Sequence, residues 1–158
     1  VKEGLNLTAT QISSDIEKDV GKITTSSPEA LQYYIEGRRS HMANKDDQAI
    51  AYMEKAVEID PEFAMAYRSM AMSYFNSGRS MEARKYLKKA LELSTRLPEN
   101  EKLFIEANVF YFDEDYDKEI ELLERLVRTY PGRNIDNSLA GAYELVWTRA
   151  TGFRASRF

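Results

Sequence analysis

The sequence predicts an all-α fold, a right-handed α-solenoid of stacked helix–turn–helix repeats. Apolar residues recur at spacings of three and four, as they do on one face of a helix. The whole pattern also returns about every 34 residues along the chain. With only 7 glycines and 4 prolines among 158 residues, the composition favours helices over a β-sandwich with many turns. A chain of this length can bury a core as one domain or as a short array of repeats.

The repeat emerges when the segment from Ala30 is aligned with the segment from Ala64, 34 residues further on. Small residues fall at equivalent positions, with Gly37, Ala49 and Ala56 in the first copy and Ala71, Ala83 and Ala90 in the second. Small side chains let neighbouring helix backbones approach, and large ones such as Tyr33 and Met53 fill the remaining space. A third copy follows at a shift of 36 residues and is weaker, because it has Glu119 and Leu126 at two of the small positions.

The segment from Ala49 to Pro61, AIAYMEKAVEIDP, together with Tyr33, Gly37, Tyr67 and Ala71, resembles the tetratricopeptide repeat family. The resemblance covers about residues 30–131. It implies a scaffold without enzymatic activity, in which the first helix of each repeat lines a concave groove that binds a peptide or helix of a partner protein.

Start signals and the period together predict the elements. Proline followed by an acid marks helix starts near Pro28, Pro61 and Pro98. We expect helices at 29–43, 47–59, 63–76, 80–94, 99–112 and 116–130, and a seventh from about Asp136. The predicted organisation is an N-terminal arm or linker at 1–26 with a short amphipathic helix over 10–20, three repeats at 27–131, and a partial fourth repeat or capping helix with a tail at 132–158.

The composition excludes several classes of function. There is no cysteine and only one histidine, His41, so neither disulfides nor zinc sites built on thiolates or several imidazoles can form. The net charge of −4 argues against binding nucleic acid. The sequence also contains no apolar run of about 18 residues, the length that is needed to span a membrane. No serine lies in a nucleophile motif. We therefore expect no enzyme activity, no cofactor and no metal, and a protein or peptide as the partner.

One acidic segment needs a separate test, because the acids from Asp113 to Asp117 together with Glu124 have the spacing of a calcium-binding loop. Lys118 stands where such a loop needs glycine, and the repeat register places Tyr116 and the residues after it in a helix. We interpret the segment as an acidic turn whose charges favour the start of the next helix.

The resemblance assigns groove positions to ten residues: Tyr34, Arg38, Met65, Arg68, Met72, Phe75, Asn76, Phe104, Asn108 and Tyr111. Methionine and aromatic side chains suit an adaptable apolar peptide or helix, and the arginines and asparagines suit carbonyl groups or a carboxylate. The chaperone-tail clamp of the family has lysine and asparagine at the positions of Tyr34 and Arg38, which argues against a chaperone C-terminus as the ligand.

Alternatives stay open at this point. Some of the ten residues could be inter-helix core, and the groove could be filled by the N-terminal arm or by a neighbouring copy. A homodimer is the alternative function, formed through an exposed terminal face with Val146, Trp147 and Phe153. Because the chain begins at Val1 and residues 24–30 resemble the lead-in to repeats of multidomain bacterial signalling proteins, we expect a module of a larger bacterial regulatory protein. We favour a cytoplasmic location slightly over a periplasmic one.

Overall fold

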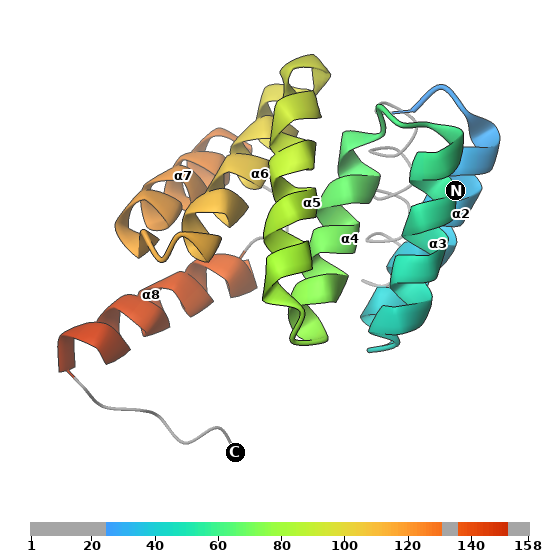
Figure 1. Cartoon of the computed structure of the whole chain (residues 1–158). Coiled ribbons are helices and arrows are strands. Elements are labelled where there is room, and N and C mark those ends of the chain that lie inside the picture. The colour runs from blue at the N-terminus through green and yellow to red at the C-terminus, as the bar shows by residue number, and fades with distance from the viewer. Residues whose placement is uncertain (1–24, 131–135, 152–158) are drawn as a thin grey trace, which may run out of the picture. The chain divides into compact units, whose positions relative to one another are not determined.

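The computed structural model describes residues 25–130 and 136–151 (Figure 1). These residues form seven α-helices and one 3-10 turn, with no strand. The helices are α2 (Pro28–Met42), α3 (Asp46–Ile59), α4 (Ala64–Asn76), α5 (Ser80–Leu93), α6 (Glu99–Phe112), α7 (Tyr116–Thr129) and α8 (Asp136–Thr151), and the turn is η1 (Ser94–Arg96). Within the described residues, every helix boundary that the sequence predicts lies within one residue of the observed one, so the predicted all-α class is confirmed. No helix in the described part of the chain is long and apolar enough to cross a membrane.

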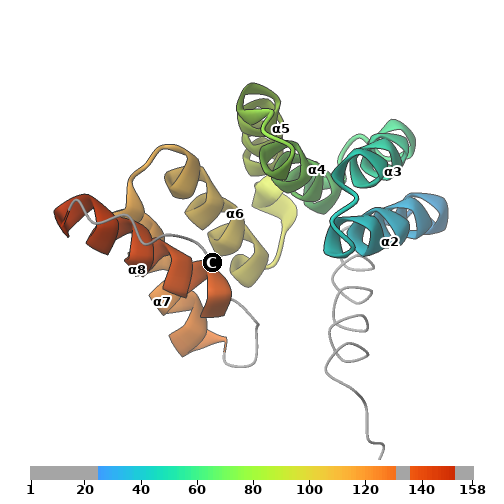
Figure 2. The same cartoon turned by 90° about the horizontal axis from the view of Figure 1, so that it is seen from below.

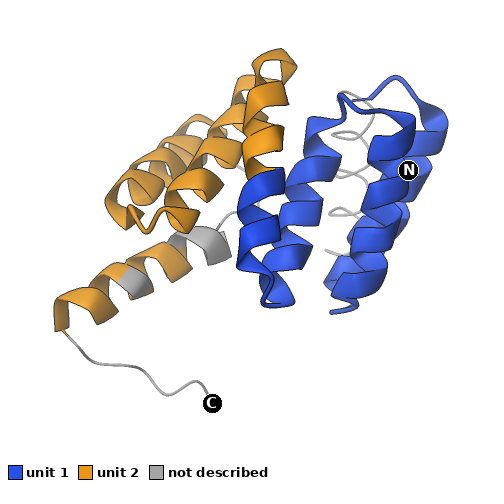
Figure 3. Cartoon of the chain, viewed as in Figure 1, with its two compact units in different colours: residues 1–86 blue, residues 87–158 orange. Residues whose placement is uncertain are grey.

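The chain divides into two compact units, residues 1–86 and 87–158, and the boundary falls within α5 (Figure 3). In unit 1, α3 packs against both α2 and α4; in unit 2, α7 packs against both α6 and α8 (Figure 2). The predicted division at 1–26, 27–131 and 132–158 stays a prediction. Most of the arm, including its helix over 10–20, and the tail with Phe153 lie outside the described residues.

Three helix–helix turns close in the same way, although their sequences differ. The second residue after α2, α4 and α6 is in each case in the left-handed region: Asn44 has φ 57°, Gly78 has φ 80° and Glu114 has φ 60°. The following N–H then donates to a carbonyl five residues earlier, from Lys45 to Ser40 and from Arg79 to Tyr74, both at 2.9 Å, and from Asp115 to Phe110 at 3.0 Å. Glycine and asparagine adopt this conformation readily, whereas at Glu114 it costs about 1–2 kcal/mol.

Helix starts are stabilised by local side chains, as the sequence predicts. Ser27 precedes α2, and its Oγ accepts a hydrogen bond from the Ala30 N–H at 3.2 Å, while Pro28 occupies the first turn. Asp115 caps α7 by accepting from the Lys118 N–H at 3.4 Å. These contacts satisfy backbone donors that an isolated helix end leaves unpaired.

The small residues of the repeat lie where helices meet. Gly37 on α2 is so close to α3 that a Cβ atom there would stand 2.7 Å from Met53 Cε and 3.3 Å from the Ala49 carbonyl oxygen. Ala49 and Ala56 on α3 are completely buried. In unit 2, Ala107 of α6 and Ala142 of α8 share a core with larger apolar residues: Leu103, Phe104, Leu123 and Leu126. Close helix packing at small side chains therefore recurs in both units.

Glu119 breaks this pattern. It takes the place that Ala49 has on α3, yet only 3% of its side chain is exposed, and its Oε2 atom has no hydrogen-bond partner in the described part of the chain. Burial raises the pKa of Glu119 to about 7, because removing a carboxylate from water disfavours its charged form. Between about pH 4.3 and pH 7 the folded protein therefore binds a proton at Glu119 more strongly than the unfolded chain does.

This proton makes stability depend on pH. The contribution of protonated Glu119 is fully present below about pH 4.3, the ordinary pKa of a glutamate, and is lost as the pH rises to about 7. We expect the free energy of unfolding, measured with urea, to decrease between pH 4.5 and pH 8. This decrease should be larger in the wild type than in Glu119→Gln, by an amount on the order of 2 kcal/mol. Equal pH dependence in both proteins would show that Glu119 does not titrate in this range.

Candidate peptide-binding surface

The ten predicted groove residues lie on the first helices of the repeats, with seven on α2 and α4 in unit 1 and three on α6 in unit 2. Four are buried, with exposed fractions of 9% or less: Tyr34, Met65, Phe104 and Asn108. Asn76 is exposed, and the other five are half-buried: Arg38, Arg68, Met72, Phe75 and Tyr111. The half-buried and exposed residues are the ones whose side chains reach solvent.

Tyr34 illustrates the buried group. Its side chain is 2% exposed, and its ring lies 5.0 Å from the ring of Phe63, just before the start of α4. Contact between large aromatic rings at this distance stabilises the α2–α4 contact through burial. Tyr34 therefore lies in the core of unit 1. This agrees with the alternative that some of the ten predicted groove residues belong to the core between helices.

His41, near the end of α2, connects three helices. Its Nδ1 atom lies 2.8 Å from Asp46 Oδ1 at the start of α3 and 2.9 Å from Ser73 Oγ on α4. These two contacts, to a carboxylate and to a hydroxyl oxygen, fix the orientation of the ring. Both oxygens contact the same ring nitrogen, whereas a catalytic triad places its serine and its acid on opposite nitrogens.

The charges of two arginines act on this histidine. Burial lowers the pKa of His41, the hydrogen bond to Asp46 opposes that effect, and the positive charges of Arg38 and Arg68 lower the pKa further. These charges act on His41 from α2 and from α4, so the cations of both helices gather at one place. His41 is neutral at pH 7 because its pKa lies below the ordinary value of 6.5. We call Arg38, His41 and Arg68 the cationic cluster, in which the two arginines carry the positive charge and His41 is neutral.

The sequence places His41, the single histidine, in the first predicted helix, but it does not reveal the partners Asp46 and Ser73. The signal in the sequence for this contact is the spacing between His41 and Ser73. Ser73 follows His41 by 32 residues, close to one repeat, which brings the ends of α2 and α4 together. The alignment of small and large residues does not show a polar contact of this kind.

In unit 2, the predicted positions lie on α6 beside the acidic turn. Tyr111 packs its ring 5.7 Å from Phe112 and 6.3 Å from Tyr116, the first residue of α7. Asn108, one turn earlier, is only 7% exposed. The two sets of predicted residues thus belong to separate units, and a single groove that runs across both stays a prediction.

The acidic turn does not have the arrangement of a calcium loop. Besides capping α7, Asp115 pairs with Lys118 Nζ at 2.5 Å, and Glu124 accepts a hydrogen bond from the Tyr143 hydroxyl. Among the described residues, no group of three or more acidic or histidine side chains is arranged to hold a metal ion. The helix that begins at Tyr116 fits the predicted interpretation as an acidic helix start.

Comparisons with known proteins agree with this architecture. A family model described as tetratricopeptide repeat matches residues 52–85. The Sgt2 TPR domain from Aspergillus fumigatus superposes with a TM-score of 0.58 at 14% identity, over 85% of this chain and 91% of that one. The first TPR of Spaghetti (RPAP3), bound to the HSP90 peptide SRMEEVD, gives a TM-score of 0.54 at 19% identity, over 79% of this chain and 98% of that one. No curated relative matches the sequence. At these identities the two structures show the fold alone.

The cationic cluster can be tested through its histidine, which gives a unique NMR signal because it is the only one in the chain. We expect Arg68→Gln to raise the pKa of His41, since a nearby positive charge is removed, and Asp46→Asn to lower it. Arg39→Gln, on the same helix but paired with Glu36, serves as the control and should leave the pKa unchanged. A pKa that responds equally to all three substitutions would argue against the cluster.

Proposed function

Because the chain carries a tetratricopeptide repeat within an α-solenoid, we propose that it is a non-enzymatic protein–protein interaction module. The binding surface in this proposal is the half-buried face of α2 and α4, and the ligand is a peptide or helix that presents a carboxylate. Stacked helices preform such a surface, so the protein loses little conformational entropy when the ligand binds.

The observation that carries the proposal is the cationic cluster. Arg38 and Arg68 lie on neighbouring first helices, and the charges of both act on the same imidazole. Guanidinium groups can bind a carboxylate with paired hydrogen bonds. Met72 and Phe75, both half-buried on α4, supply adaptable apolar contacts on the same helix as Arg68. A charge-assisted hydrogen bond of this type contributes about 1.5–3 kcal/mol.

The comparison with Spaghetti supports the class of ligand, because the peptide bound to that protein carries three acidic residues. Our proposal concerns an acidic peptide of another partner, since Tyr34 and Arg38 differ from the lysine and asparagine of the chaperone-tail clamp. We further propose that the module belongs to a larger bacterial regulatory protein, as its N-terminal segment implies.

Self-association is the second candidate. Two aromatic side chains one turn apart on α8, Tyr143 and Trp147, are 47% and 50% exposed, and large apolar side chains are seldom left so open without a partner. In this proposal two copies pair through that face. Light scattering distinguishes the candidates, because a mass that does not change with concentration argues against the dimer.

The peptide proposal predicts the effect of a charge reversal. Peptides selected from a random library for binding to the full chain should be enriched in acidic residues, and Arg68→Glu should weaken their binding about tenfold or more. Arg68→Glu combined with Phe75→Ala should weaken it further, because an apolar contact is also lost. Binding can be measured by fluorescence anisotropy, with circular dichroism to confirm that each variant is folded.

The control is Arg39→Glu, which makes the same change of charge on an arginine that is 61% exposed and paired with Glu36. We expect this variant to bind as the wild type does, apart from a small long-range effect that added salt removes. If the folded double variant binds the selected peptides as tightly as the wild type, the face of α2 and α4 is not the binding site.

A further inference from the structure

His41 belongs to the half-buried face of α2 and α4, and it is the only histidine in the chain. It stands three residues after Arg38, about one turn along the same side of α2. Its side chain is 20% exposed, and its Nδ1 atom contacts Asp46 of α3 at 2.8 Å and Ser73 of α4 at 2.9 Å. The imidazole is therefore held in place by three helices and lies largely out of water.

Charges from all three helices act on this imidazole. Burial lowers the pKa of His41, Asp46 of α3 raises it, and the positive charges of Arg38 on α2 and Arg68 on α4 lower it. A carboxylate that binds the two arginines offsets the charges that oppose protonation, whereas Asp46 remains beside the ring. A ligand that neutralises the arginines therefore favours a proton on His41.

We propose that the face of α2 and α4 takes up a proton at His41 when it binds an acidic peptide, so that binding is tighter in mildly acidic solution. This inference rests on the proposed function, because it concerns the same surface and the same class of ligand. The coupling is reciprocal, since the factor by which protonation strengthens binding equals the factor by which the ligand favours protonation. Affinity therefore falls as the pH rises through the pKa of His41 in the complex.

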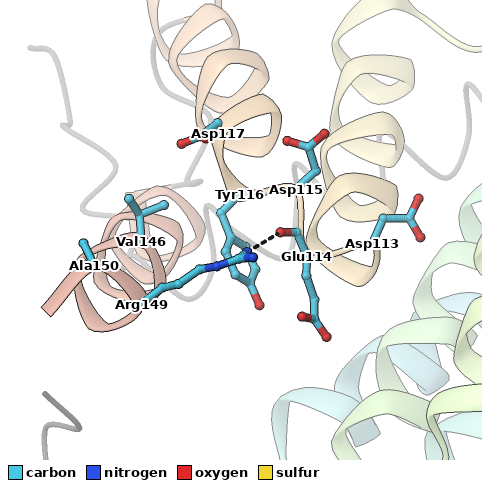
Figure 4. A pocket seen from close by; sticks show the side chains of 8 residues that line it. All are labelled: Asp113, Glu114, Asp115, Tyr116, Asp117, Val146, Arg149 and Ala150. Carbon is cyan, nitrogen blue, oxygen red and sulfur yellow. Dashed lines mark hydrogen bonds between the residues drawn. The ribbon is translucent and has the colours of Figure 1, made fainter. Parts of the chain in front are cut away.

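The acidic turn gives unit 2 a surface of the opposite charge. Four acidic side chains line a pocket there, Asp113, Glu114, Asp115 and Asp117 (Figure 4). Arg149 of α8 lines the same pocket and donates to the backbone carbonyl oxygen of Glu114, at 3.4 Å (Figure 4). An excess of carboxylates repels an acidic peptide, so we expect such a ligand to bind at the cationic cluster of unit 1 instead.

Titration of the full chain with the peptide N-acetyl-tetraglutamate amide, followed by NMR at pH 7.5 and pH 5.5, tests this proposal. The probe stays mostly ionised at both pH values, because the ordinary pKa of glutamate is about 4.3. We expect its Kd to be about threefold lower at pH 5.5 than at pH 7.5. In His41→Asn, whose amide has nearly the place of Nδ1 but does not titrate, this difference should disappear. Glu119, whose pKa is about 7, is present in both proteins, so its effect cancels in the comparison.

The ring signals of His41 supply a second measurement that needs no variant. We expect the pKa of His41 to be higher in the protein saturated with the probe than in the free protein. Reciprocity requires this rise to equal the logarithm of the limiting ratio between the Kd values at high and at low pH. The two measurements therefore have to agree with each other.

Three results would overturn the inference and leave the proposed function intact: equal Kd values at the two pH values, the same pH dependence in folded His41→Asn, or a pKa of His41 that does not rise on saturation. The proposed function is tested separately at pH 7.5, where His41 is neutral and Arg68→Glu should weaken binding of the probe. If the probe binds at neither pH, or binds folded Arg68→Glu as tightly as the wild type, both proposals are contradicted.

Discussion

The structure depends on the close approach of paired helices at small side chains. At Gly37 a methyl group would require Met53 to move, because its Cε atom would lie only 2.7 Å from the added carbon, and the Ala49 carbonyl oxygen would lie 3.3 Å away. Ala49 and Ala56 are completely buried for the same reason. When backbones approach this closely, larger side chains such as Met53 must fill the space on either side, and the order of small and large residues becomes fixed along each helix. A repeat period in the sequence is the consequence of that requirement.

The need for small residues where helices meet also determines which other positions on each helix are available for binding. Where a helix does not need a small residue, its side chains can face solvent, and on α2 and α4 these include Arg38 and Arg68. His41 connects the ends of these helices through Asp46 and Ser73, so the arginines are carried by a fixed framework. Glu119, by contrast, occupies a packing position, where its charge is disfavoured at neutral pH. Differences between repeats that share a framework are therefore informative.

Helices and turns were predictable because the period, the prolines and the turn residues constrain the backbone locally. Side-chain exposure was not, since a helix turns by about 100° per residue and neighbouring positions can be exposed or buried. Tyr34 and Met65 are buried, whereas Arg38 and Arg68, one turn along the same helices, are only half-buried. The contact of His41 with Ser73 depends on the distance between helices, which residue types do not specify. Glu119 stood out in the sequence as a departure from the repeat, but only burial shows its consequence.

The account is tested most directly by urea unfolding of two variants of α3, Ala49→Leu and Ala51→Leu. Ala49 is completely buried, and its carbonyl oxygen lies close to Gly37 of α2, whereas Ala51, two residues along, is exposed. If close packing at small residues holds the fold together, Ala49→Leu should lower the free energy of unfolding by about 2–3 kcal/mol. Ala51→Leu should change it by less than about 0.5 kcal/mol. Equal stability of the two variants would contradict the account, because α2 and α3 would then not require a small residue where they meet.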